Sequence, residues 1–366
     1  MSGTTWKERL RGVSFQKKLF VSVNIVLAAA CAASMLGFLA VRESFETVTA
    51  AQRFGGESGI RFAQIACYMP KGGEKTEEDI WSVRQKLETK FVEQSLEAPE
   101  GGSLFIDAYS TSASLSVTTD HGEAQVKAIG VGGDFFYFHP LRLRSGAYIA
   151  ERDLMDDLVV LDEALAWRLF GGVELTGMTL YISGEPFVVG GVIQMEDDFA
   201  TGRALQQEGN LFLSYSALKR LNDTAAIDCY EIVLPDPISG YARGVMEELL
   251  PVGDGSIVEN SGRFSAARLW ELVKNFGERS MRTGALVYPY WENALRVAED
   301  HAALLLVLAV LFSVFPLVSA VVLVIRGCLL CANSAKRIAL SGFETAVERR
   351  REKQYERAQA KNTEGE

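Results

Sequence analysis

Two long runs of uncharged residues constrain this chain more than any other feature of its sequence. The first covers residues 19–41 and the second covers residues 302–325, and neither contains Asp, Glu, Lys or Arg. Each run exceeds the roughly 20 apolar residues that an α-helix needs to cross a hydrocarbon layer about 30 Å thick. The sequence therefore predicts two transmembrane helices, separated by a long central segment at residues 42–300.

The distribution of charge indicates on which side of the membrane each part lies. Lys and Arg outnumber Asp and Glu by 5 to 1 in residues 1–18 and by 9 to 6 in residues 326–366, whereas acids outnumber bases by 40 to 23 in residues 42–300. Basic residues beside membrane helices favour the cytoplasmic side. We therefore expect a two-span cell-membrane protein with a cytoplasmic N-terminus, a cytoplasmic charged tail and an extracytoplasmic segment between them.

The first apolar run has a second interpretation as a secretory signal. It follows a basic start, and Leu27 to Cys31 approaches a lipoprotein processing site. Its 23 uncharged residues exceed the length of a signal core, which is about 7 to 15 residues. We therefore favour an uncleaved membrane anchor.

Two local features of the apolar runs bear on how the helices pack. Ala29, Ala33 and Gly37 recur every four residues, which places them on one helix face and lets another helix approach closely in lipid. This face is expected to contact the second run or a partner, although an alanine-rich helix that contains the spacing by chance explains it equally well. Pro316 in the second run is expected to kink the helix, because proline lacks the N–H donor.

The central segment alternates between patterns typical of strands and of helices. A helix is expected to begin at Thr76, because Asp79 follows three residues later and the apolar residues from Ile80 to Phe91 share one face. Asp162 is expected to cap a short helix that Gly171 ends. These patterns predict an α+β domain, with a mixed sheet, helices and a β-rich module inserted at about 134–194. The predicted strands are residues 59–69, 104–109, 114–119, 124–131, 158–161, 178–182, 187–193, 210–214 and 229–234.

The approach to the second apolar run is predicted to be an amphipathic stalk helix at about 263–283, where apolar residues are interleaved with charges. Tyr288, Tyr290 and Trp291 follow it. Aromatic residues favour the boundary between water and lipid, but about ten residues separate Trp291 from the apolar run. These three residues therefore have two possible interpretations, as an aromatic belt at the membrane surface or as part of a short stalk.

The sequence shows no reaction centre. It lacks the phosphate-binding glycine loop of ATPases and the nucleophile elbow of hydrolases, and its three histidines are far apart. We expect no catalytic residue, no cofactor, no metal site and, because the central segment is acidic, no nucleic-acid partner. Cys67 and Cys229 fall in predicted extracytoplasmic strands, where an oxidising compartment would allow a disulfide if the strands are adjacent.

Several motifs in the inserted module resemble one known family. The chain has Asp134, Phe135 and Phe136, then a turn that ends at Gly146, then the helix pattern that Val160 begins. A glycine-led hairpin closes the module at Val188 to Ile193. This series is similar to the MacB-like periplasmic core domain of ABC transporter permeases. The match is moderately specific over about sixty residues and less specific over residues 59–258.

The resemblance implies a function as well as a placement. In permeases of the MacB and FtsX type, cytoplasmic loops engage an ATPase. These permeases continue with two further membrane helices, whereas a charged tail of about forty residues follows the second apolar run here. We therefore expect a non-catalytic permease-like subunit of an export or mechanotransmission system, with an ABC ATPase and a further permease subunit or a second copy as partners. The alternative is a two-span sensor or scaffold whose outer domain binds a ligand or an envelope protein.

Overall fold

The computed structural model describes residues 14–56, 59–96, 98, 102–151, 153, 155–205, 209–280 and 286–363. It contains two compact units, one formed by Gly37–Leu306 and the other by Met1–Leu36 with Val307–Glu366. The first unit holds the predicted extracytoplasmic segment with the adjoining ends of both predicted membrane helices. Parts of three predictions lie outside the described residues: the basic residues 1–13, the end of the predicted stalk at 281–283, and the tail residues 364–366.

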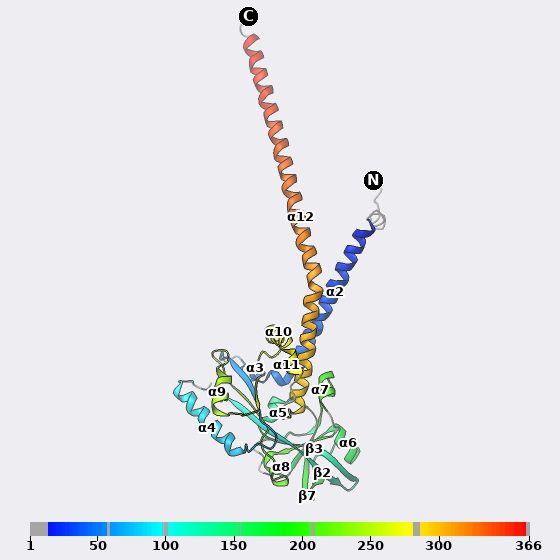
Figure 1. The fold of residues 1–366 in the computed structure, drawn as a ribbon, viewed down its shortest axis with the longest axis vertical. Helices are drawn as coiled ribbons and strands as arrows, with labels where there is room; N and C mark the ends of the chain where they lie inside the picture. The colour runs from blue at the N-terminus through cyan, green and yellow to red at the C-terminus, as the bar shows by residue number, and fades with distance from the viewer. Residues whose placement is uncertain are drawn as a thin grey trace. The chain divides into compact units, whose positions relative to one another are not determined.

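Ten strands of the described residues form one mixed sheet in the first unit (Figure 1). They are β1 (Phe62–Tyr68), β2 (Ile106–Thr119), β3 (Gly122–Gly133), β4 (Arg142–Gly146), β5 (Leu158–Asp162), β6 (Thr179–Ile182), β7 (Glu185–Gln194), β8 (Asn210–Ser214), β9 (Cys229–Pro235) and β10 (Ser256–Glu259). Their order is β10-β1-β9-β2-β3-β8-β5-β7-β4, and β6 pairs with β2 and β7. The β3·β8 and β5·β7 pairs are parallel, which confirms the predicted mixed sheet. Strands of the predicted 134–194 module continue this sheet.

The strand β2 differs from its prediction. The sequence suggests two strands at 104–109 and 114–119, but the structure has one, and it pairs with β3 without a break from Ala108 to Thr119. The intervening Ser110, Thr111 and Ser112 are polar but small, and they contain no glycine or proline that would end a strand. The first half of β2 also pairs with β9, so β2 joins the two halves of the sheet.

Two helices cover one face of the sheet around β1 and β9. They are α4 (Glu77–Glu93) and α9 (Tyr241–Leu249), and both pack into one apolar cluster with β1 and β9. The predicted start of α4 is confirmed, because the Thr76 N–H donates to the Asp79 carboxylate at 3.0 Å. An ion pair between Lys90 and Glu248 links the two helices, which lie on the same side in Figure 1.

The opposite face carries the contacts that matter for the second membrane helix. It is covered by α3 (Ala50–Gly55), α5 (Phe135–Phe138) and the first turns of α12 (Tyr290–Thr363). Phe135, Phe138, Tyr290 and Trp291 share this cluster and are each at most 5% exposed. The beginning of α12 is therefore part of the core of the outer domain.

The inserted module shares one apolar cluster with β2, β3 and β8, and α6 (Glu163–Phe170) and α8 (Tyr215–Leu221) contribute to it. Asp162 caps α6 as predicted, because its carboxylate accepts the Leu165 N–H at 2.7 Å. The same carboxylate accepts the Asn210 side-chain N–H at 3.0 Å, which ties β5 to β8. Gly171 ends α6 at φ +74°, a left-handed conformation that favours glycine.

The suggested disulfide has no support in the structure. Cys67 and Cys229 lie on adjacent strands, but Cys67 is opposite Tyr230 and Cys229 is opposite Tyr68. This offset of one residue places the two thiols in different core clusters on opposite faces of the sheet, and both cysteines are free. A bond between them would need a shift of strand register.

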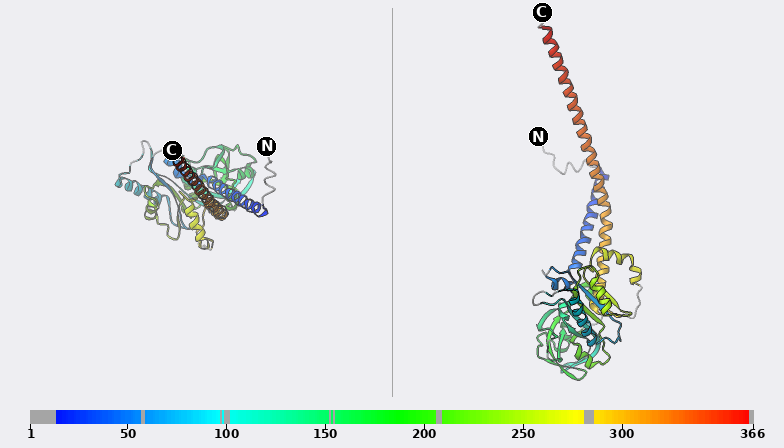
Figure 2. Two further views of the ribbon diagram at one scale, coloured as in Figure 1. Left: turned by 90° about the horizontal axis from the view of Figure 1, so that it is seen from above. Right: turned by 90° about the vertical axis from the view of Figure 1, so that its left-hand side faces the viewer.

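The approach to the second apolar run differs most from its prediction. Instead of one stalk helix, the described residues form α10 (Ala266–Lys274) and α11 (Phe276–Ser280), with Asn275 between them. Figure 2 shows both, in yellow, beside the first turns of α12. Leu269 of α10 packs in a cluster with Phe38, Phe45 and Ala302, so α10 lies against the ends of both predicted membrane helices. The interval between Trp291 and the second apolar run is helical and belongs to α12.

The second unit contains α2 (Phe15–Glu43) up to Leu36 and α12 from Val307 onward, including the charged residues that follow the second apolar run. Both helices are long and apolar enough to cross a membrane. Within this unit the Cys31 thiol donates to the Ala309 carbonyl at 3.3 Å, and the Phe20 and Phe315 rings lie 5.9 Å apart. The structure assigns α12 as one helix through Pro316, so a kink there stays a prediction.

The predicted small-residue face of α2 is only partly used. Ala29 and Ala33 are exposed, and they do not form the contact with α12 in the second unit. Gly37 belongs to the first unit, where a Cβ at this position would lie 3.4 Å from the Leu305 side chain. The two alanines therefore remain a predicted face for a partner.

Candidate functional site

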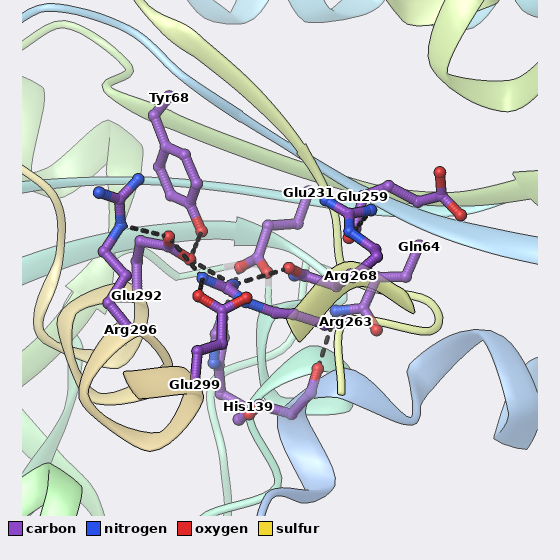
Figure 3. A network of polar contacts seen from close by, with 12 residues as sticks. Gln64, Tyr68, His139, Glu231, Glu259, Arg263, Arg268, Glu292, Arg296 and Glu299 are labelled. Atoms are coloured by element: carbon purple, nitrogen blue, oxygen red, sulfur yellow. Dashed lines mark hydrogen bonds and ion pairs between the residues drawn. The ribbon is translucent and has the colours of Figure 1, made fainter. Parts of the chain in front are cut away.

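A buried arginine joins the sheet domain to the first turns of α12 (Figure 3). The Arg263 guanidinium donates to both carboxylate oxygens of Glu292, at 2.7 and 2.9 Å, and to both oxygens of Glu299, at 2.7 and 3.3 Å. Glu292 and Glu299 are seven residues apart on α12 and so lie on one face of that helix. Arg263 thus holds two positions that lie about two turns apart on α12.

The three charges of this network are almost completely removed from water. The side chains of Arg263, Glu292 and Glu299 are 2%, 0% and 10% exposed. Burial alone would lower the pKa of the Arg263 guanidinium, but the two carboxylates raise that pKa well above its ordinary value. Charges buried in this way are stable only while they remain paired, because an unpaired charge in the interior is strongly destabilising.

The central sheet reaches the same network through β1. The Tyr68 hydroxyl donates to Glu292 at 3.0 Å. Burial and the Glu292 carboxylate raise the pKa of Tyr68 well above its ordinary value, so the hydroxyl stays protonated and remains a donor. Asn260, just after β10, accepts from Arg263 at 3.0 Å and donates its backbone N–H to the Gln64 carbonyl of β1 at 2.8 Å. Two routes therefore connect α12 to β1.

A third group of contacts ties the network to α11. Arg279 donates to Glu299 at 2.8 Å and to the Arg296 carbonyl at 2.9 Å, and it pairs with Asp300 at 3.2 Å. Arg296 donates to Glu292 at 2.8 Å from one turn further along α12. We call the set of Tyr68, Arg263, Arg279, Glu292, Arg296 and Glu299 the ionic joint.

An aromatic contact flanks the ionic joint. The Trp291 ring lies 4.7 Å from the His139 ring and 5.6 Å from the Phe135 ring, both measured between centroids. His139 in turn contacts the Glu231 carboxylate of β9, with 2.5 Å between Nε2 and Oε2, and both side chains are buried. The first turn of α12 is therefore fixed to the sheet by packing as well as by charge.

The ionic joint holds charge in place and offers no arrangement for catalysis. Each carboxylate in it is paired with at least one arginine, and its hydroxyl donor is a tyrosine with a raised pKa. In the part of the chain that the structure describes, no three His, Cys, Asp or Glu side chains gather in a way that could hold a metal ion. The contacts of the joint bind α12 to β1, and separating its buried charges would carry a high energetic cost.

None of the residues singled out from the sequence belongs to the ionic joint. Cys67 and Cys229 lie inside the sheet core, and Ala29, Ala33, Gly37 and Pro316 lie on the membrane helices. The joint itself left a weak signal in the sequence, since Glu292, Arg296 and Glu299 recur at spacings of four and three just before an apolar run. Arg263 gave no signal, because its pairing depends on tertiary structure.

Comparisons with known proteins find one family model and solved structures that are similar to this chain. The family model for the MacB-like periplasmic core domain matches residues 30–239. Among solved structures, the periplasmic region of MacB from Actinobacillus actinomycetemcomitans is similar at 17% identity and a TM-score of 0.41, covering 64% of this chain and 100% of that one.

The extracellular domain of the noncanonic ABC-type transporter YknZ from Gram-positive bacteria is similar at 16% identity and a TM-score of 0.36, covering 51% of this chain and 90% of that one. No curated protein matches the chain. The family match covers more than half of the sequence and includes the motifs from Asp134 to Ile193. The chain therefore belongs to the family of the MacB-like periplasmic core domain, found in ABC transporter permeases.

Proposed function

We propose that this chain is a non-catalytic, permease-like subunit of an ABC-type export or mechanotransmission system in which a partner ATPase supplies the energy. The observation that carries the proposal is the ionic joint, because Arg263 is bound to Glu292 and Glu299 of α12 while Tyr68 of β1 donates to the same Glu292. Family membership supports the ATPase as the kind of partner. A further permease subunit or a second copy of the chain would complete the membrane part.

The joint explains how motion would pass through the membrane. An ATPase on the cytoplasmic side acts on the inner ends of the membrane helices, and α12 is one continuous helix from Tyr290 onward. A displacement of α12 must either carry β1 with it or separate Arg263 from two buried carboxylates. Separation leaves uncompensated buried charges, which costs about 3–5 kcal/mol. The outer domain therefore follows α12 in small movements.

We further propose that both termini are cytoplasmic, on the strength of the basic residues beside both apolar runs. Labelling of spheroplasts with a membrane-impermeant maleimide tests this orientation. Trp167 is 56% exposed on α6, so Trp167→Cys in a chain with Cys328→Ser and Cys331→Ser is expected to be labelled from outside. The native Cys328 and Cys331 are exposed and are expected to react only after lysis. The reverse pattern would show the opposite topology.

Purification from native membranes tests the partner. The full chain, extracted in mild detergent, is expected to carry an ATPase with a phosphate-binding loop, detected by mass spectrometry and by ATP hydrolysis that vanadate inhibits. A preparation with no ATPase, in which a small molecule raises the melting temperature of the chain, would instead favour a sensor or scaffold and would contradict the proposal.

A further inference from the structure

Aromatic residues at the ends of the two membrane helices are arranged differently from the sequence pattern. Tyr290 and Trp291, which suggested a belt, are 3% and 5% exposed and face the core of the outer domain. Large aromatic side chains are nevertheless exposed at the same end of the domain. They are Phe199, Trp270 and Phe276, and they come from three separate helices.

Trp270 and Phe276 are placed by α10 and its successor α11. Leu269 is 1% exposed and packs in the cluster that contains Phe38 of α2 and Ala302 of α12. Phe38 lies near the end of the first apolar run and Ala302 begins the second, so α10 lies at the level of the membrane boundary. The next residue, Trp270, is 44% exposed, and Phe276 at the start of α11 is 48% exposed. Trp270 therefore presents an indole ring to the surroundings at this level.

Phe199 reaches the same level on α7 (Phe199–Ala204). Its ring lies 4.6 Å from the His301 ring, and His301 directly precedes the second apolar run. Ala200 belongs to the cluster that also contains Leu269. The Phe199 ring is 47% exposed, and the Arg203 guanidinium lies 4.4 Å from its centroid. A cation over an exposed aromatic ring matches the composition of proteins at a lipid headgroup layer.

We propose that Phe199, Trp270 and Phe276 form an aromatic collar that inserts into the headgroup region of the outer leaflet. Three observations favour lipid over a protein partner. The rings lie near the ends of two helices that are apolar enough to cross a membrane, and they come from three separate short helices. A cation, Arg203, lies over one of them, Phe199. Exposed Phe and Trp rings gain free energy at the headgroup boundary. The inference rests on the two membrane helices and is independent of the ATPase partner.

Fluorescence quenching by brominated lipid tests the collar in the full chain reconstituted into phosphatidylcholine nanodiscs. Bromine atoms placed high on the acyl chains, next to the headgroups, quench only tryptophans at that depth. In Trp270→Phe, the decrease in tryptophan fluorescence caused by the bromines is expected to be clearly smaller than in the wild type. Trp81→Phe is the matched control, because Trp81 is 60% exposed on α4 in the outer domain, and it is expected to leave the quenched amount unchanged.

A second variant places a fluorescent reporter at another position of the collar, on α7. Phe199→Trp is expected to increase the fluorescence that shallow bromines quench and to respond less to bromines placed near the bilayer centre. Equal quenched amounts in the wild type and in Trp270→Phe would overturn the proposal, as would a tryptophan at position 199 that no brominated lipid quenches. Both substitutions exchange one exposed aromatic ring for another, so the fold is expected to tolerate them.

Discussion

Replacing Arg263 with methionine is expected to lower the free energy of unfolding of the outer domain by about 3–5 kcal/mol. The substitution leaves Glu292 and Glu299 in the interior, where Arg296 and Arg279 are the remaining partners. Two carboxylates that share a buried site repel each other, and burial penalises their charged forms. Thermal and denaturant unfolding of the full chain in detergent measures the effect.

A matched control separates this effect from the loss of any arginine. Arg243 pairs with Glu247 one turn away on α9, and its side chain is 46% exposed. Arg243→Met is therefore expected to change stability by less than about 0.5 kcal/mol. Adding Glu292→Gln and Glu299→Gln to Arg263→Met is expected to recover part of the loss, because the two buried carboxylate charges are removed. Arg279 keeps Asp300 as a partner, and the Arg296 side chain is 24% exposed. Equal losses in Arg263→Met and Arg243→Met would show that the ionic joint does not stabilise the domain.

Replacing Trp291 with alanine is expected to cost about 3–5 kcal/mol through the cavity that it leaves. The indole is 5% exposed and packs on Phe135 and His139, which join α12 to the sheet. Among the described residues its Nε1 has no hydrogen-bond partner. Trp291→Phe removes that unpaired donor and keeps much of the apolar contact, so it is expected to lose clearly less than the alanine variant.

The control for this substitution is Trp167→Ala, since Trp167 is 56% exposed on α6. Its expected change is within about 0.5 kcal/mol of zero. The same melting experiment serves for both positions. If Trp291→Ala and Trp167→Ala unfold at the same melting temperature, the aromatic contact does not hold α12 on the sheet.

Elements with local signals agree between sequence and structure. The start of α4 rests on Thr76 and Asp79, which are three residues apart, and α6 rests on a cap at Asp162 and a left-handed glycine at Gly171. Their hydrogen bonds form between close neighbours in the chain, so local patterns suffice to predict them. The mixed sheet could likewise be predicted from strand-like runs and from the family motifs.

Elements that depend on distant contacts were missed. The strand β2 continues through Ser110 to Ser112 because β3 pairs with it along this whole stretch and β9 pairs with it up to Ser110. The sequence around these serines gives no such information. Tyr290 and Trp291 are buried because α5 and β1 cover them. Isolated aromatic residues before an apolar run equally suggest a membrane belt.

The ionic joint could not be predicted from local sequence patterns either, because it also depends on contacts between residues far apart in the chain. Its acidic side repeats along one face of α12, but its central Arg263 follows β10, almost thirty residues earlier in the chain. Nothing in the sequence near Arg263 distinguishes it from the exposed Arg243 or the partly buried Arg268. Only the fold brings Arg263 within 2.7 Å of both glutamates.

Hydrogen exchange of the purified complex with and without ATP tests the central claim most directly. If the ionic joint couples α12 to the sheet, ATP will change the protection of residues 290–306 and of β1 together in the wild type. In a complex that carries Arg263→Met and has been shown to remain folded, the change will be confined to α12. An ATP-induced change in β1 that persists unaltered in the Arg263→Met complex would contradict the account.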